Sequence, residues 1–251
     1  LNEAVKEAKL IFLALPTPPG EDGSADLSYV LGVANQLGKI LNDYKVIIDK
    51  STVPVGTSEK VTKEIAMHAK VEFDVVSNPE FLREGDAIRD FIYPDRVVIG
   101  TDSSKANKVL KSLYLPIIKK TSRYFKTSRR GAELIKYASN AFLATKISFI
   151  NEIANLCEKT GIDVKDISFG MGSDQRIGDR FLRAGPAYGG SCFPKDTRAL
   201  IDIGKKFNTN LSIVKSVILS NDNRRLLSIK KVIQIVNNNF NNKIITFLGV
   251  T

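Results

Sequence analysis

A cysteine in a glycine-rich stretch is the most chemically informative feature of the sequence. Cys192 follows Gly189–Ser191 (GGS) and precedes Phe193–Asp196 (FPKD). Paired glycines let a backbone approach a ligand closely, and the neighbouring ammonium of Lys195 favours the nucleophilic thiolate. Asp196 would hold that ammonium or a water molecule. We predict that Cys192 is a nucleophile; the alternative is a buried cysteine that packs as a small apolar side chain.

Two polar residues with helical spacing form a second candidate. Lys136 and Asn140 are four positions apart, so they project from one face of a helix. Spacing alone favours a solvated polar stripe over a catalytic pair.

Polar segments also follow two predicted strands. Residues 51–57 (STVPVGT) follow the first and residues 78–85 (NPEFLREG) follow the second. Ligands of open α/β sheets bind beyond the carboxyl ends of strands, so Glu80 and Glu84 are placed to act as a base or to bind a hydroxyl. A hydroxyl in 51–57 would cap a helix, which is the commoner use, or contact a cofactor.

The other cysteine and the histidine are not expected to do chemistry. We predict that Cys157, in a long helical stretch, belongs to the core and that His68, in a polar stretch, lies at the surface. Two cysteines cannot form a disulfide framework. One histidine without a Cys-x-x-Cys pair excludes the common zinc sites, so we expect no metal.

The elements that would position these residues change in character near residue 129. Before it, apolar runs alternate with helical patterns, which predicts a parallel α/β sheet with helical crossovers. The strands are expected at 9–15, 45–49, 73–77 and 96–100, and the helices at 27–41 (with Asp26 as N-cap), 57–70 and 104–113.

The later part of the chain has helical patterns. No Gly or Pro occurs from 132 to 160, which predicts a helix of about 44 Å. So long a helix often lies against a partner helix, within the chain or across a dimer. Further helices are expected at 164–169, 196–207 and 211–234, a glycine-rich loop at 185–195, and a strand at 243–249.

The composition is that of an ordinary globular protein. The 251 residues are 43% hydrophobic and 25% charged, and the apolar runs are well short of the ~20 residues of a membrane span. The net charge of +10 is scattered, which predicts a basic solvated surface. It would admit an anionic partner, but no zinc-finger or RNA-binding signature is present. We expect neither a nucleic-acid nor a membrane partner.

Several segments, taken in order, resemble the UDP-glucose/GDP-mannose dehydrogenase family. The most specific is GGSCFPKD (189–196), and the resemblance spans essentially the whole chain. The other matching segments are the Pro-Thr-Pro turn at 16–18 with DGSADLSYV (22–30), STVPVGT, NPEFLREG, the helix around 133–152, FLRAGPAYGGSCFPKD (181–196) and FLGVT (247–251).

The resemblance implies an enzyme that oxidises the C6 alcohol of a nucleotide sugar to a carboxylate in two NAD-dependent steps. We expect UDP-glucose as substrate, UDP-glucuronate as product, a cytoplasmic location and a homodimer formed through the long helix. The implied fold is α/β: a partial Rossmann-type parallel sheet (1–128), an all-helical dimerisation domain with one long central helix (129–236), and the first strand of a UDP-binding domain (237–251).

The resemblance also assigns roles position by position. Cys192 would capture the aldehyde as a thiohemiacetal and then become a thioester. Lys136 and Asn140 would stabilise the oxyanion; Asp196 would orient water, and Glu80 would be the base for thioester hydrolysis. The implied cofactor contacts are Thr17, Thr52, Glu84 and Lys195. The implied substrate contacts are Lys136, Asn140, Phe81, Leu82, Arg83, Phe181, Leu182, Arg183, Ala184, Gly185, Gly189 and, reaching across a dimer, Arg176.

The sequence departs from the family pattern at identifiable points. Ala187 stands where Gly is usual, which would cost about 1 kcal/mol or more if that position needs a positive φ. No G-x-G-x-x-G is present for the NAD pyrophosphate. We therefore expect the chain to begin downstream of the first βαβ unit and to end one strand into the UDP-binding domain.

Alternative functions stay open at this level. One is a dehydrogenase for GDP-mannose or a UDP-N-acetylhexosamine, and another is a non-catalytic dimerisation remnant, which the missing glycine turn suggests. Nucleic-acid binding would rest on the net charge alone.

Overall fold

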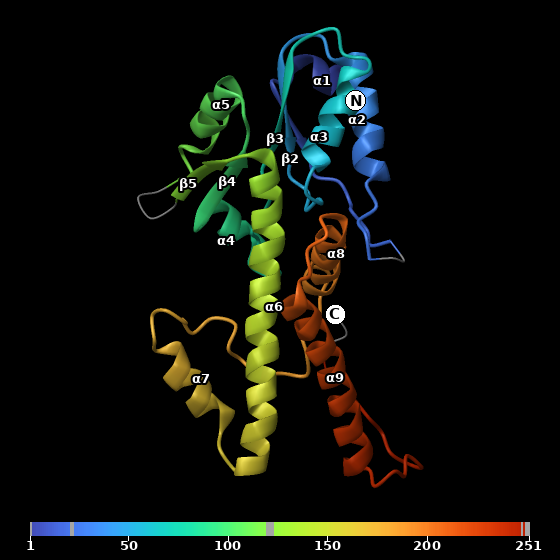
Figure 1. The fold of residues 1–251 in the computed structure, drawn as a ribbon, viewed down its shortest axis with the longest axis vertical. Helices are drawn as coiled ribbons and strands as arrows, with labels where there is room; N and C mark the ends of the chain where they lie inside the picture. The colour runs from blue at the N-terminus through green and yellow to red at the C-terminus, as the bar shows by residue number, and fades with distance from the viewer. Residues whose placement is uncertain (1, 21–22, 119–122, 247, 249–251) are drawn as a thin grey trace. The chain divides into compact units, whose positions relative to one another are not determined.

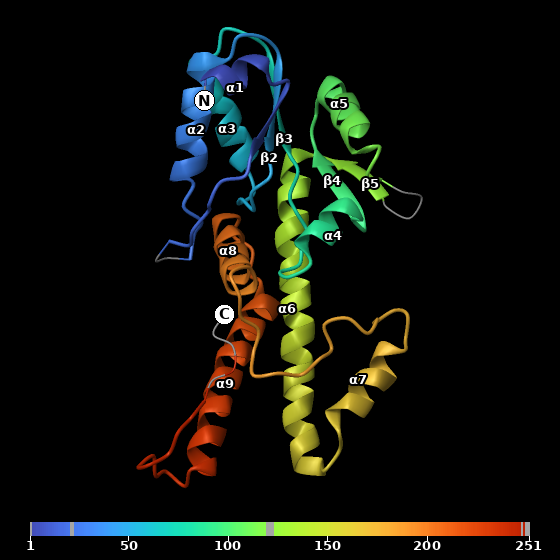
Figure 2. The ribbon, with the colours of Figure 1, turned by 180° about the vertical axis from the view of Figure 1, so that it is seen from behind.

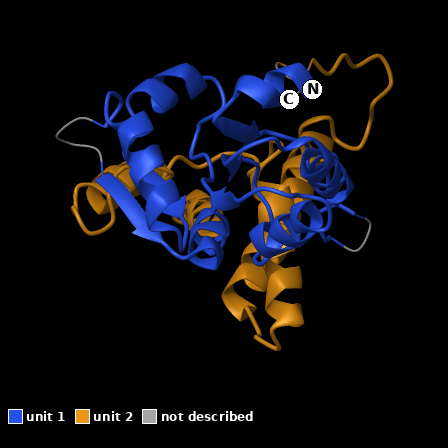
Figure 3. Ribbon diagram, turned by 90° about the horizontal axis from the view of Figure 1, so that it is seen from above, with its two compact units in different colours: residues 1–138 blue, residues 139–251 orange. Residues whose placement is uncertain are grey.

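The computed structural model describes residues 2–20, 23–118, 123–246 and 248. The chain divides into two compact units, residues 1–138 and 139–251 (Figure 3). Each unit is described by itself. The long helix α6 (Arg129–Thr160) supplies residues to both.

A five-stranded sheet forms the centre of the first unit (Figure 1). Its strands are β1 (Leu10–Leu13), β2 (Lys45–Asp49), β3 (Phe73–Ser77), β4 (Arg96–Gly100) and β5 (Arg123–Thr127). They lie side by side in chain order. The sequence predicted β2, β3 and β4 with these bounds, because each is a short apolar run. It missed β5, whose residues are mostly exposed.

The sheet is mixed rather than wholly parallel. Neighbouring strands are parallel except β3 and β4, which meet antiparallel at Ser77 and Gly100. The prediction of an all-parallel sheet is therefore wrong at this pair. Between these strands, α4 (Ala87–Ile92) has no buried residue. It therefore does not cover the sheet as the helix of a parallel crossover does.

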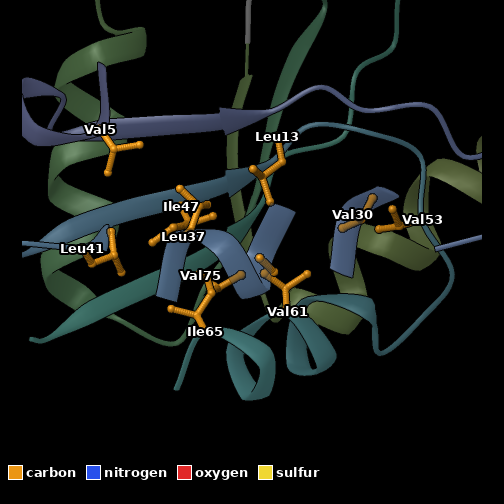
Figure 4. Close-up of a cluster of buried hydrophobic side chains, with 11 residues drawn as sticks. Val5, Leu13, Val30, Leu37, Leu41, Ile47, Val53, Val61, Ile65 and Val75 are labelled. Carbon is orange, nitrogen blue, oxygen red and sulfur yellow. The ribbon is translucent and has the colours of Figure 1, made fainter. Parts of the chain in front are cut away.

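Helices pack on both faces of the sheet. On one face, α2 (Ser28–Ile40) and α3 (Thr57–Ala66) enclose an apolar core with Ile47 of β2 (Figure 4). On the other face, α5 (Ser104–Tyr114) packs against Val46 and Ile48. This follows from the alternation of side chains along a strand. A further helix, α1 (Asn2–Glu7), adds Val5 to the first core.

The N-terminus of α2 and the C-terminus of α3 differ from the predictions. The N-cap of α2 is Leu27, not Asp26, although the Asp26 carboxylate accepts a hydrogen bond from the Ser28 backbone N–H at 2.8 Å. The third helix, α3, ends at Ala66, short of the predicted residue 70.

The second unit is helical throughout its regular elements. It contains residues 139–160 of α6 together with α7 (Val164–Gly172), α8 (Phe193–Lys206) and α9 (Ser212–Ile235). In this unit α9 runs beside α6 and α7 lies on the opposite side of it (Figures 1 and 2). Glu152 accepts a hydrogen bond from Ser220 at 2.5 Å, which joins α6 to α9. The prediction of an α/β part followed by helices around one long helix is confirmed.

The predicted strand at 243–249 is absent from the described residues. Residues 243–246 have no regular secondary structure, and residues 247 and 249–251 lie outside the described part of the chain. A strand requires a paired neighbour, and the sheet described above consists of β1 to β5 alone. Within the described residues, no helix combines the length and the apolar character needed to cross a membrane.

Candidate active site

In the first unit, an ion pair joins two of the candidate residues. Lys136 of α6 donates a hydrogen bond from Nζ to Glu80 Oε1 at 2.9 Å. The Lys136 side chain is 4% exposed and that of Glu80 is 26% exposed. Lys136 is therefore not part of a solvated stripe. Glu80 Oε2 also accepts from the Leu82 backbone N–H at 2.6 Å, which shapes the loop after β3.

The same loop carries an aromatic ring, Phe81, that two cations approach. Lys136 Nζ lies 5.4 Å and Arg96 Cζ 4.0 Å from the centroid of Phe81, distances at which cation–π attraction operates. Burial lowers the pKa of Arg96, which the sequence analysis did not select. Leu82 and Glu84 are exposed on this loop.

Arg83, also exposed, binds acidic residues of its own segment. Its guanidinium donates to Asp90 at 2.6 Å and to Asp86 at 2.7 Å. Of the predicted substrate contacts on this loop, Phe81 therefore lies near Lys136, whereas Arg83 binds Asp86 and Asp90.

Lys50 is a further charged residue of this group that sequence reasoning missed. Burial lowers its pKa to about 8; the charge of Glu80 opposes the shift and that of Lys136 adds to it. The signal that could have found it is its position, directly after the buried strand β2 and before the STVPVGT segment.

Two predicted cofactor contacts meet at the carboxyl ends of β1 and β2. Thr17 Oγ1 donates to the Thr52 backbone oxygen at 3.0 Å, and both residues are half-buried. Ser51 Oγ braces the adjoining turn by donating to Leu15 O at 2.7 Å and accepting from Leu15 N at 2.8 Å. The hydroxyls of this segment do not cap α3, whose N-cap is Gly56.

The N-terminus of α3 binds a carboxylate from another helix. Glu133 of α6 accepts hydrogen bonds from Gly56 N at 2.6 Å, Ser58 N at 2.8 Å and Ser58 Oγ at 2.7 Å. Burial raises the pKa of Glu133, and these bonds oppose that rise. Sequence reasoning did not select Glu133, because its partners lie some 75 residues earlier in the chain.

Asp49, at the end of β2, is a buried acid. Burial and the charge of Glu133 raise its pKa to about 8. Among the described residues, neither of its carboxylate oxygens has a hydrogen-bond partner. The protonated form is therefore favoured at neutral pH.

In the second unit, Asp196 is the centre of a polar cluster. Its Oδ2 accepts from Asn140 Nδ2 at 2.6 Å, and its Oδ1 lies 3.0 Å from Lys195 Nζ. Asp196 is 1% exposed. The expectation that Asp196 holds the ammonium of Lys195 is met, and Asn140 is buried rather than solvated.

Cys192 lies beside this cluster in the chain and is exposed. It occupies the N-cap position of α8, where the helix dipole favours negative charge. Because α8 begins at Phe193, the glycine-rich loop ends at Cys192 rather than at Lys195. The alternative of a buried Cys192 is wrong. Cys157 is buried and His68 is exposed, as predicted.

The loop before Cys192 carries most of the remaining candidates. Phe181 has a left-handed backbone (φ 65°), which is strained for an aromatic residue. Ala187 is not among the described residues with a positive φ. The predicted cost of about 1 kcal/mol for an alanine with a positive φ at this position therefore does not arise. Leu182 is buried, Ala184 and Gly185 are half-buried, and Arg183 and Gly189 are exposed.

Arg176, the residue implied to cross a dimer, is 89% exposed in its side chain. It binds Asp174 at 2.6 Å in the turn after α7. Within the described residues of its unit, the Arg176 guanidinium has no partner other than Asp174.

Comparisons with known proteins agree with these observations. Residues 1–118 match the NAD binding domain, and residues 130–223 the central domain, of the UDP-glucose/GDP-mannose dehydrogenase family. A UDP-glucose 6-dehydrogenase of Rhizobium meliloti (strain 1021) is 48% identical over 255 residues, which cover 100% of this chain and 58% of the relative.

Solved structures give the same result. A UDP-glucose dehydrogenase from the archaeon Pyrobaculum islandicum aligns with a TM-score of 0.90 and 40% identity, over 94% of this chain and 55% of that one. A GDP-mannose dehydrogenase from Pseudomonas aeruginosa aligns with a TM-score of 0.65 and 28% identity, over 95% and 56%. The chain thus spans little more than half the length of these relatives. The chain belongs to the UDP-glucose/GDP-mannose dehydrogenase family.

Proposed function

We propose that the protein oxidises UDP-glucose to UDP-glucuronate with two molecules of NAD, through a covalent intermediate on Cys192. The observation that carries the proposal is the exposed Cys192 at the N-terminus of α8, adjacent in the chain to the Lys195–Asp196 pair. The identity of 48% to a UDP-glucose 6-dehydrogenase supports this substrate. The chain spans 58% of that relative.

The proposed chemistry uses the chain's own residues in sequence. After the first oxidation, Cys192 Sγ adds to the C6 aldehyde and gives a thiohemiacetal. The second oxidation converts it to a thioester, which water hydrolyses to the acid and free thiol. Lys136 and Asn140 would donate hydrogen bonds to the oxygen that becomes negative, an interaction worth a few kcal/mol each.

Asp196 and Glu80 would manage water and protons. Asp196 accepts a hydrogen bond from Asn140 and forms an ion pair with Lys195, so its carboxylate is held in place to orient a water molecule. Glu80, half-exposed and paired with Lys136, would accept the proton of the water that attacks the thioester.

NAD, when bound, accepts a hydride in each oxidation. Thr17, Thr52, Glu84 and Lys195 would hold it. The polar groups of Thr17 and Thr52, brought together at the carboxyl ends of two parallel strands, fit a dinucleotide at that edge. The substrate loop, residues 181–185 with Gly189, and the Phe81–Arg83 segment would contact the nucleotide sugar.

A homodimer is also part of the proposal. Phe142, Phe149 and Leu156 of α6 are 65%, 46% and 58% exposed and are spaced seven residues apart. Exposed apolar residues at heptad spacing are typical of a helix that packs against a second helix. Arg176, exposed at 89%, would reach the partner's substrate. The predicted domain boundaries at 128 and 236 and the cytoplasmic location stay predictions.

A cysteine exchange tests the reaction. Cys192→Ala should abolish UDP-glucuronate formation from UDP-glucose and NAD in the complete protein, because no sulfur remains to carry the acyl group. Cys157→Ala, at the buried cysteine, is the matched control and should retain turnover. Normal acid production by Cys192→Ala would falsify the assignment.

The nucleotide sugar is tested separately. NADH formation is followed with UDP-glucose, GDP-mannose and UDP-N-acetylglucosamine in turn. We expect UDP-glucose to give the highest kcat/KM. The alignment with a GDP-mannose dehydrogenase makes GDP-mannose the second candidate. Absence of turnover with all three would favour the non-catalytic alternative.

A further inference from the structure

The backbone of the loop that leads to Cys192 is hydrogen-bonded to side chains of neighbouring helices. Residues 182–189 contain no helix or strand. Backbone groups in such a segment need other partners when they are shielded from water. Leu182 O accepts a hydrogen bond from Ser168 of α7 at 2.7 Å. For Gly185 and Tyr188, the side-chain partners come from α6 and α9, within the second unit.

Gly185 is held through both of its backbone groups. Its N–H donates to Asn151 Oδ1 of α6 at 2.8 Å, and its C=O accepts from Arg224 Nε of α9 at 3.0 Å. Arg224 also donates to Asn155 Oδ1. One guanidinium therefore joins the loop, α6 and α9, which suits the fixed fork geometry of arginine.

Tyr188 is held in the same way by a single side chain. Its N–H donates to Asn221 Oδ1 at 2.8 Å, and Asn221 Nδ2 donates to its C=O at 3.1 Å. Asn221 is 5% exposed. A carboxamide can donate and accept at once, so it pairs with the peptide as a neighbouring strand would.

These contacts extend to the residue beside Cys192. Asn221 and Arg224 are three residues apart on α9 and share one face of it. The rings of Tyr188 and Phe181 both pack edge-on against the ring of Phe193, each with 6.1 Å between the ring centroids. Phe193 directly follows Cys192 in the chain.

We propose that Asn221 and Arg224 are positioning residues, through which α9 sets the conformation of the loop and the placement of Cys192. They act through Gly185, Tyr188 and Phe193 and do not touch the reacting atoms. This inference deepens the proposed function, because it concerns the loop that carries the proposed nucleophile.

Hydrogen exchange tests the proposal without reference to activity. In Asn221→Ala and Arg224→Ala, the amides of residues 183–191 should exchange about tenfold faster or more than in the wild type, since hydrogen bonds that hold the loop backbone are lost. The matched controls are Asn223→Ala and Arg225→Ala, at exposed positions of the same helix, which should leave this exchange unchanged. Cys157 should stay unreactive to iodoacetamide, which shows that the packing of α6 is intact.

Two further measurements separate positioning from a purely structural role. Iodoacetamide should alkylate Cys192 about threefold more slowly in Asn221→Ala, because the sulfur loses its fixed place at the α8 N-terminus. In the complete protein, kcat should fall about tenfold with the KM for NAD within about twofold. Arg224→Lys, which keeps one donor for Gly185, should recover part of the loss seen in Arg224→Ala.

The outcomes are distinct. Unchanged loop exchange in both alanine variants overturns the proposal, and so does faster exchange with unaltered Cys192 alkylation and kcat. If Asn221→Ala does not fold, the Arg224 series decides the question. A wild-type protein without turnover contradicts the proposed function, whereas the exchange and alkylation results still decide whether α9 positions Cys192.

Discussion

At the scale of single residues, burial determines what a charged group does. Asp196 and Lys136 are both almost fully buried, and each is paired with a partner of opposite charge. Asp49 is buried without a hydrogen-bond partner among the described residues, so its pKa rises to about 8. Two buried carboxyl groups of one chain therefore differ in their surroundings, because one has an ionic partner and the other has none.

The raised pKa of Asp49 predicts a pH-dependent stability. Its pKa is about 4 in an unfolded chain and about 8 when folded. Between these values the folded state binds more protons. The free energy of unfolding therefore falls as pH rises from about 4 to about 8, and this contribution is then constant.

Asp49→Asn should remove this decline. The amide imitates the protonated acid, so at pH 8 the variant should be more stable than the wild type by on the order of 1 kcal/mol or more. Urea unfolding at pH 5 and pH 8 measures it, with the exposed Asp166→Asn as control. The measurements stop at pH 8 because Lys50 has a pKa lowered to about 8. Above that pH, deprotonation of Lys50 in the folded state makes the free energy of unfolding rise with pH. Equal slopes for Asp49→Asn and the wild type would contradict the prediction.

At the scale of elements, the contacts between the first turns of α6 and α3 include two that differ in burial. Glu133 is 2% exposed and accepts three hydrogen bonds at the α3 N-terminus. Arg130 binds Glu59 at 2.6 Å, but both side chains are more than a third exposed. Buried and hydrogen-bonded charge should matter much more than the exposed ion pair.

Removal of each contact tests this difference. Glu133→Ala should cost about 2–4 kcal/mol, because it leaves three donors, two of them buried, without an acceptor. Arg130→Ala, one turn earlier on the same helix, should cost no more than about 1 kcal/mol. Urea denaturation of both variants at one pH measures the difference, and similar losses would show that burial is not the deciding factor.

At the scale of the whole molecule, the proposed dimer rests on exposed apolar side chains of α6. Phe142, Phe149 and Leu156 form an exposed apolar row on the part of α6 that belongs to the second unit. Phe149→Glu would place a charge at the proposed interface twice, once from each subunit of a twofold dimer. The variant should therefore be monomeric.

Sedimentation at micromolar concentration checks the oligomeric state. Lys159→Glu, at an exposed position of the same helix outside the row, is the control and should remain dimeric. A wild-type protein that sediments as a monomer would contradict the dimer and leave the apolar row without its proposed partner.

The sequence alone determined the elements whose signal is local. The strands β2, β3 and β4 are short apolar runs, and the long helix has no Gly or Pro from residue 132 to 160, so their places follow from residue type. The candidates Cys192, Lys136 and Glu80 also came from the sequence, through the segment GGSCFPKD and its companions. The strand β5 was missed, because an exposed edge strand has little hydrophobic pattern.

Only the tertiary structure decided which distant groups meet. The pairing of Glu133 with α3 spans some 75 residues, and that of Asn221 with Tyr188 spans 33. No local pattern encodes such contacts, because they depend on how helices pack. The antiparallel contact of β3 with β4 is of the same kind. Burial, and with it the raised pKa of Asp49 and the lowered pKa of Lys50, exists only after the chain has folded, because it is the surrounding protein that excludes water.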